Sequence, residues 1–143
     1  MRLIILAMAL VAAPAMLSPA FAEPAAEAAK DAKPGLFVKQ GETWFFKIKD
    51  GQPADMRSGG EDEKPNGDEI RVSLDGGNMV VLNGSPVAYN YQAFIAKKPS
   101  DKGNRTSVCT LLPGVTAFEN WPEKLPGIRL TNFTEAGDSM GCF

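Results

Sequence analysis

The residues that could do chemistry in this 143-residue chain are few. It contains no histidine, and its only cysteines are Cys109 and Cys142. Without histidine, the chain lacks the base of a Ser-His-Asp triad or a Cys-His pair, and it lacks the imidazole ligand common in zinc sites. Ser85 follows a glycine but precedes Pro86, which does not fit the nucleophile-elbow pattern, so we interpret it as a turn residue. These observations favour a non-enzymatic role.

The two cysteines are expected to form a disulfide. Cys109 and Cys142 enclose just over thirty residues, and two cysteines of an exported chain usually pair. A catalytic thiolate needs a neighbouring group to stabilise it, and the chain has no lysine or arginine after Arg129. A bond to another chain, a metal-binding pair and two free thiols are the alternatives.

Acidic residues are densest in the stretch EDEKPNGDE, residues 61–69. Clustered carboxylates can bind Ca²⁺, which prefers six to eight oxygen ligands. The spacing does not fit the calcium-loop pattern, because Lys64 and Ser73 stand at positions that need oxygen ligands from acids. We therefore predict a solvated loop with no metal and no cofactor, and a calcium site is the alternative.

The most distinctive stretch is GVTAFENWPEKLPGIRL, which contains Glu119, Trp121 and Glu123. Its prolines restrict the backbone and lower the cost of ordering a binding loop, and tryptophan offers a large contact area with one polar group. These three residues are the candidate contact site for an envelope protein or a carbohydrate. For the aromatic residues we favour a structural role, in which Trp121 and Phe118 fold inward and fill one end of the domain. Glu119 and Glu123 are also the candidate carboxylates for glycoside hydrolysis, which requires two such groups beside a sugar.

Residues 1–22 are typical of a cleaved export signal. Arg2 precedes an apolar stretch over residues 3–13, and the letters AFA at 20–22 match a small-residue cleavage site. The apolar stretch is too short to span about 30 Å of hydrocarbon as an untilted helix, although an uncleaved anchor is the alternative. We expect a periplasmic or secreted protein that spans no membrane once the signal is removed.

The remaining chain divides into a tether and one domain. Residues 23–35 are alanine, proline and charge with no large apolar side chain to anchor a helix, so we predict a flexible tether. Residues 36–143 are then a single disulfide-stapled domain. Without the signal, 14 basic and 17 acidic residues give a net charge of −3. This small acidic excess does not favour nucleic acid as a partner.

Apolar residues within the domain mostly recur with a period of two, the period of a half-buried β-strand. Glycine, proline, asparagine and aspartate separate the alternating runs, as turns require. We predict about seven short strands, with one helical turn near TAFENW. The six clearest runs cover residues 44–48, 70–74, 79–82, 87–95, 106–112 and 127–133.

This spacing of strands and turns predicts an all-β fold, an antiparallel β-sandwich with an immunoglobulin-like arrangement, and a small open barrel is the alternative. The sequence thus favours a non-enzymatic binding or envelope-associated module. A small carboxylate-dependent glycoside hydrolase of the envelope or extracellular space is the second hypothesis.

Overall fold

The computed structural model describes residues 32–143, so the predicted export signal and most of the predicted tether lie outside the described residues. Within the described range the chain forms strands and turns with no helix. The nine strands are β1 (Leu36–Lys39), β2 (Thr43–Lys49), β3 (Gln52–Ser58), β4 (Ile70–Asp75), β5 (Asn78–Asn83), β6 (Tyr89–Ile95), β7 (Asn104–Thr106), β8 (Thr116–Asn120) and β9 (Gly127–Glu135).

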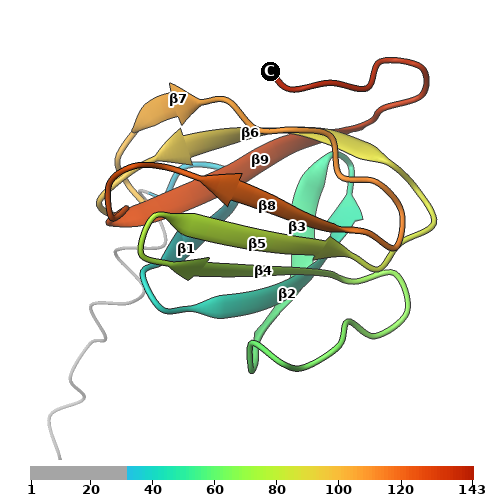
Figure 1. Cartoon of the computed structure of the whole chain (residues 1–143), viewed down its shortest axis with the longest axis horizontal. Coiled ribbons are helices and arrows are strands. Elements are labelled where there is room, and N and C mark those ends of the chain that lie inside the picture. The colour runs from blue at the N-terminus through green and yellow to red at the C-terminus, as the bar shows by residue number, and fades with distance from the viewer. Residues whose placement is uncertain (1–31) are drawn as a thin grey trace, which may run out of the picture.

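The strands form two antiparallel sheets that pack as a β-sandwich (Figure 1). The four-stranded sheet has the order β1-β9-β6-β7, and the five-stranded sheet has the order β3-β2-β4-β5-β8. The predicted all-β sandwich is confirmed. The two sheets do not close into one, so the barrel alternative is wrong.

Several predicted elements need correction. The structure has nine strands where about seven were expected. The predicted runs did not include β1, and they did not include β3 and β7, which are too polar and too exposed to show an apolar period. The run 106–112 makes only isolated β-bridges after β7 ends at Thr106, and the stretch TAFEN is strand β8 rather than a helical turn. The run 79–82 alternates between buried and half-buried residues, so it is covered fully on one face only.

The core lies between the sheets and is built by the alternating apolar residues. Ile70, Val72 and Leu74 of β4 are all buried, as their shared parity predicts. Burying a side chain of this kind stabilises a fold by about 1.5–3 kcal/mol. Around Phe133 of β9 the core becomes aromatic: its ring stacks on Tyr91 of β6 at 5.3 Å between centroids. It also makes edge contacts with Phe46 and Tyr89.

Strand β9 contains a β-bulge that changes the direction of its side chains. Asn90 of β6 pairs with Thr134, but Gln92 pairs with Thr131, so β9 has one extra residue between these pairs. Asn132 in the bulge has a φ of 51°, in the left-handed region that asparagine tolerates better than most residues. As a result Phe133 is buried while Asn132 is exposed.

The chain end is tied to the domain by the disulfide between Cys109 and Cys142, which confirms the expected pairing. Val108 and Phe143 exchange two backbone hydrogen bonds of 3.1 and 3.0 Å beside it. Neither cysteine lies in a strand, since β9 has already ended at Glu135. The disulfide instead holds a separate C-terminal segment, seen in red above the labels of β6 and β9 in Figure 1.

Replacing both cysteines by alanine is expected to lower the free energy of unfolding by about 3–4 kcal/mol, because the bond closes a loop of 33 residues in the unfolded chain. Urea denaturation of the wild type and the Cys109→Ala/Cys142→Ala variant measures the difference. Reductant should destabilise the wild type and leave the variant unchanged. Equal stability of the wild type and the variant in the absence of reductant would contradict the stabilising role of the disulfide.

Candidate functional site

The predicted contact residue Trp121 lies directly after β8, at the edge where the two sheets meet. Its side chain is half-buried and packs against the hydrophobic core. Its indole Nε1 donates a 2.7 Å hydrogen bond to Thr106 Oγ1 of β7. This geometry supports the favoured interpretation, in which Trp121 fills the end of the domain. Phe118 does not pack inward beside Trp121, because 75% of its surface is exposed. The prediction that Phe118 folds inward is therefore wrong.

The two predicted glutamates have different surroundings. Glu119 of β8 accepts a 2.7 Å hydrogen bond from the backbone nitrogen of Cys109, so its carboxylate supports the backbone beside the disulfide. Burial, and secondarily the charge of Glu119, raises the pKa of the Tyr91 hydroxyl. Glu123 is exposed in the turn between β8 and β9. The structure thus brings Glu119 and Trp121 to one edge of the sandwich, where both are held by structural hydrogen bonds.

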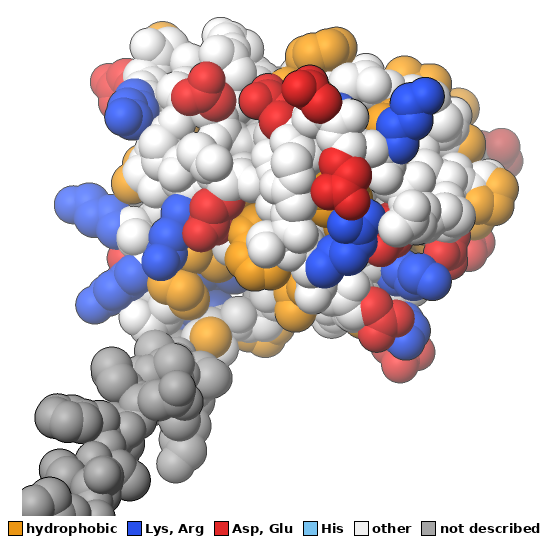
Figure 2. Space-filling view, turned by 90° about the horizontal axis from the view of Figure 1, so that it is seen from below, with side chains coloured by type: hydrophobic (Ala, Val, Ile, Leu, Met, Phe, Trp, Pro, Cys, Tyr) orange, Lys and Arg blue, Asp and Glu red, His pale blue; other side chains and the backbone are white. Residues whose placement is uncertain are grey.

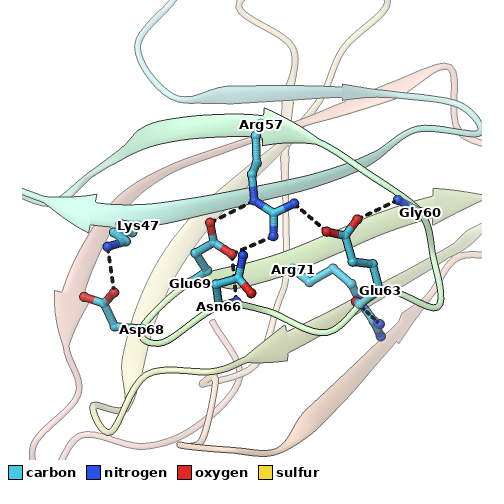
Figure 3. A network of polar contacts seen from close by, with 8 residues as sticks. All are labelled: Lys47, Arg57, Gly60, Glu63, Asn66, Asp68, Glu69 and Arg71. Atoms are coloured by element: carbon cyan, nitrogen blue, oxygen red, sulfur yellow. Dashed lines mark hydrogen bonds and ion pairs between the residues drawn. The ribbon is translucent and has the colours of Figure 1, made fainter.

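The acidic stretch 61–69 is organised by one arginine of β3. The Arg57 guanidinium donates from Nε and Nη2 to the two oxygens of Glu69, at 2.9 and 2.8 Å, and from Nη1 to Glu63 at 2.7 Å. Figure 3 shows Arg57 between these two carboxylates. Fork-shaped pairs of this kind are among the strongest hydrogen bonds in proteins. Glu69 is only 6% exposed, so this pair holds the end of the loop against the sheet.

The same arginine covers an aromatic ring on the outer face of the five-stranded sheet. Phe46 points into the core, so its neighbour Phe45 points outward, yet it is fully buried. The Arg57 guanidinium lies 4.0 Å from the Phe45 ring centroid, a cation–π contact. A side chain at Gly59 would collide with the same ring. Residues 59–69 therefore close over Phe45, which is more order than the solvated loop that the sequence predicted.

The calcium alternative has little support in this arrangement. Glu63 and Glu69 both already bind Arg57, whose hydrogen bonds are the largest of the effects that lower the pKa of each carboxyl. Over residues 32–143, no group of three acidic or cysteine side chains is placed to hold a metal ion. Lys47 and Asp68 form a further ion pair at 3.2 Å.

Charge is mixed on the surface that Figure 2 presents. Acidic and basic side chains are interspersed there, with small apolar patches between them. Exposed ion pairs also occur, such as Lys49–Asp55 at 2.8 Å. Such pairs contribute little to stability, and interspersed charges build no broad field of one sign.

A groove of about 310 Å³ lies on the outer face of the four-stranded sheet. The C-terminal segment forms one wall, held in place because the Asn90 side chain donates to the Ser139 carbonyl and Thr110 pairs with Gly141. The lining is polar apart from two aromatic residues, and it contains no acid. It comprises Asn90, Tyr91, Gln92, Arg105, Asn132, Thr134, Ser139 and Phe143.

A chain of side-chain hydrogen bonds fixes the amides of this groove. The Thr131 hydroxyl donates to Gln52 Oε1 at 2.8 Å, and Gln52 Nε2 donates to Asn132 Oδ1 at 2.9 Å. Asn132 Nδ2 then donates to Gln92 Oε1 at 2.8 Å. The Gln92 oxygen is therefore engaged, and its Nε2 makes no hydrogen bond to the part of the chain described. Because Gln92 lines the groove, its two N–H groups are available as donors to a ligand there. We call this set, Thr131–Gln52–Asn132–Gln92, the amide chain.

The sequence analysis did not predict this groove, although the sequence of β6 contains a partial signal for the groove. On the outward face of β6, Asn90 and Gln92 are polar and only Phe94 is apolar, while the inward face is apolar. The other walls come from β7, β9 and the C-terminal segment, which no local pattern brings together. The bulge at Asn132 moreover breaks the period that would have placed this residue correctly.

Replacing Glu69 by glutamine is expected to lower the free energy of unfolding at neutral pH by about 1.5–3 kcal/mol, the usual contribution of hydrogen bonds to a charged group. The pKa of Glu69 is lowered from its ordinary value of 4.5 in the fold. Its carboxylate therefore stabilises the fold fully above about pH 4.5, and this contribution disappears as the pH falls through the folded pKa. Urea denaturation of wild type and variant should show their difference shrinking below pH 4.5.

Glu61→Gln is the matched control, because Glu61 lies exposed in the same loop. It should change stability by less than about 0.5 kcal/mol. Equal effects of the two substitutions, or a difference for Glu69→Gln that persists unchanged at low pH, would refute the role given to this pair.

Comparison with known proteins gives no relative from which a role could be carried over. No protein-family model matches the chain. No curated protein and no solved structure shows significant similarity to it.

Proposed function

We propose that the protein is an exported, non-enzymatic binding module that holds a saccharide in the groove on its four-stranded sheet. The observation that carries this proposal is the amide chain, which holds Gln92 of the groove lining by its oxygen and leaves both of its amide N–H groups available as donors. Donors that are held in place before binding lose little freedom when a ligand arrives, which favours affinity. Hydroxyl and ring oxygens of a sugar are suitable acceptors for them.

The remainder of the lining fits the same ligand. Small-molecule sites are concave and combine apolar surface with a few well-placed polar groups. Phe143 is 52% exposed at the groove and offers a flat apolar face to the C–H side of a sugar ring. Arg105 of β7 is exposed and adds further donors, and the Thr134 and Ser139 hydroxyls can donate or accept.

A binding role is favoured over glycoside hydrolysis. Hydrolysis of this kind requires two carboxyl groups on either side of the scissile bond, and the groove is lined by no aspartate or glutamate. The carboxylate of Glu119 is committed to the backbone at Cys109. Glu123 is exposed in a turn rather than in the groove lining.

Export is part of the proposal and rests on the sequence of residues 1–22, supported by the disulfide, which is typical of oxidising compartments. In the range 32–143, the structure has no helix whose length and hydrophobicity would suit a membrane crossing. We place the protein in the periplasm or outside the cell, with an envelope or extracellular saccharide as ligand.

Screening the purified protein on an array of neutral and charged oligosaccharides, followed by calorimetric titration of the best binder, tests this function. Arg105→Ala and Phe143→Ala should each weaken binding by about tenfold or more, because each removes a contact worth at least about 1.4 kcal/mol. Both side chains are largely outside the core, so the fold should persist, as circular dichroism would verify.

Two control substitutions match these variants. Phe118→Ala removes another exposed phenylalanine, near Trp121, and Lys124→Ala removes another exposed cation. Neither should change the affinity. Loss of binding in Phe118→Ala with normal binding in Phe143→Ala would move the site to the Trp121 edge. No saccharide binding at all would overturn the proposed function.

A further inference from the structure

Arg129 of β9 is a cation buried on the same face as the groove. Only 4% of its surface is exposed. Its guanidinium donates to two backbone carbonyls in the loop between β6 and β7, from Nη1 to Asp101 at 2.5 Å and from Nη2 to Lys102 at 2.6 Å. It also lies 5.1 Å from the ring centroid of Phe94, in a cation–π contact. All of these partners are neutral groups.

The positive charge of Arg129 is not matched by a bonded carboxylate. Within residues 32–143, it forms no ion pair, and its Nε has no hydrogen-bond partner. Burial lowers the pKa of Arg129, and the nearby charge of Asp101 offsets this only in part. Burying an unpaired charge is costly unless another group compensates it.

A second pocket, of about 240 Å³, opens at this arginine, and we call it the cationic pocket. Two exposed lysines, Lys33 and Lys102, stand at its rim. The backbone of Lys33 is fixed beside the β6–β7 loop because its nitrogen donates to the Pro99 carbonyl at 3.0 Å. The lining is completed by one aromatic ring, one proline and two polar residues, Phe94, Pro34, Thr131 and Asn132, so it contains three cations and no acid.

The cationic pocket adjoins the groove. Asn132 lines both, and Thr131, the first member of the amide chain, lines the pocket. Strand register also connects them: Arg129 pairs with Phe94, and Phe94 pairs with Arg105 at the groove. On the other side Arg129 pairs with Phe37 of β1. A row of alternating phenylalanine and arginine thus crosses the whole outer face of the sheet.

We infer that the ligand of this face is a negatively charged saccharide, whose carboxylate or sulfate enters the cationic pocket while neighbouring sugar units occupy the groove. This inference rests on the proposed function and specifies its ligand class. The anion supplies the negative partner that Arg129 lacks in the described residues, and the two rim lysines attract the anion. The charge of Asp101 acts to raise the pKa of Arg129. Asp101 does not line the pocket, however, so the entrance of the pocket remains cationic.

Calorimetric titration of the full protein with three sets of oligosaccharides tests the inference: uronic-acid tetrasaccharides, their neutral methyl esters, and sulfated tetrasaccharides. At least one charged set should bind about tenfold or more tightly than the esters, since one favourable charge contact suffices for that difference. Binding of the charged set should weaken as salt rises from about 20 to 200 mM, because screening lengths shorten. Preference for carboxylates or for sulfates identifies the anionic group.

The double variant Lys33→Glu/Lys102→Glu reverses the charge at the rim without touching buried Arg129. It should weaken binding of the charged set by about tenfold or more and leave binding of the esters unchanged. Lys64→Glu/Lys124→Glu makes the same change in net charge at exposed positions elsewhere and should bind like the wild type. An equal loss in both variants would mean that only net charge matters, which overturns the cationic pocket.

The two proposals fail differently in this experiment. If the neutral esters bind as tightly as the charged saccharides, the inference about ligand charge is wrong and the saccharide-binding function stands. If none of the three sets binds, both proposals fall.

Discussion

In β9, the backbone of Asn132 has a left-handed conformation, with a φ of 51°. Because of this bulge, the side chains of Thr131 and Phe133 point to opposite faces of the sheet. Continued alternation would direct Asn132 into the core and Phe133 to the surface. The bulge reverses both. Phe133 enters the core, where it stacks on Tyr91 and contacts Phe46 of the opposite sheet. Asn132 turns outward and connects the amides of Gln52 and Gln92.

The core and the groove therefore share one structural cause. Phe133 joins the two sheets, and its backbone nitrogen donates to the Gly51 carbonyl at 2.8 Å, which docks the β2–β3 turn against the bulge. That turn brings Gln52 to Asn132, so the amide chain depends on the same contact. The disulfide acts at the other end of the groove, where it holds the C-terminal segment and Phe143 in place. Geometry of this kind is set before a ligand binds, which suits a recognition surface.

The sequence predicts what depends on local pattern. Ile70, Val72 and Leu74 alternate with polar residues and are buried as expected, and the all-β sandwich and the cysteine pair were both foreseeable. Phe45 shows where the pattern stops: its parity places it on the outer face, and only the loop carrying Glu69 explains why it is buried. That cover depends on a contact between segments twelve residues apart, which periodicity does not encode.

The candidate site was less predictable than the fold for a physical reason. Trp121 attracted attention because a large aromatic residue among prolines suits a binding loop, yet its indole is bound to Thr106 on the neighbouring sheet. The groove and the cationic pocket are assembled from strands whose adjacency is not sequential: β9 lies between β1 and β6. From the sequence alone, Arg129 is expected to be an ordinary outward-facing and exposed residue of an alternating strand. Its burial becomes visible only when the β6–β7 loop folds over it.

The most direct measurement of the central claim is a ¹⁵N–¹H NMR titration of the assigned protein with a uronic-acid tetrasaccharide. The account predicts that the side-chain amide signals of Gln92 and Asn132 and the guanidinium signal of Arg105 shift most, and that signals from residues 115–123 remain in place. Shifts concentrated at residues 115–123, around Phe118 and Trp121, with an unchanged Gln92 amide would contradict it.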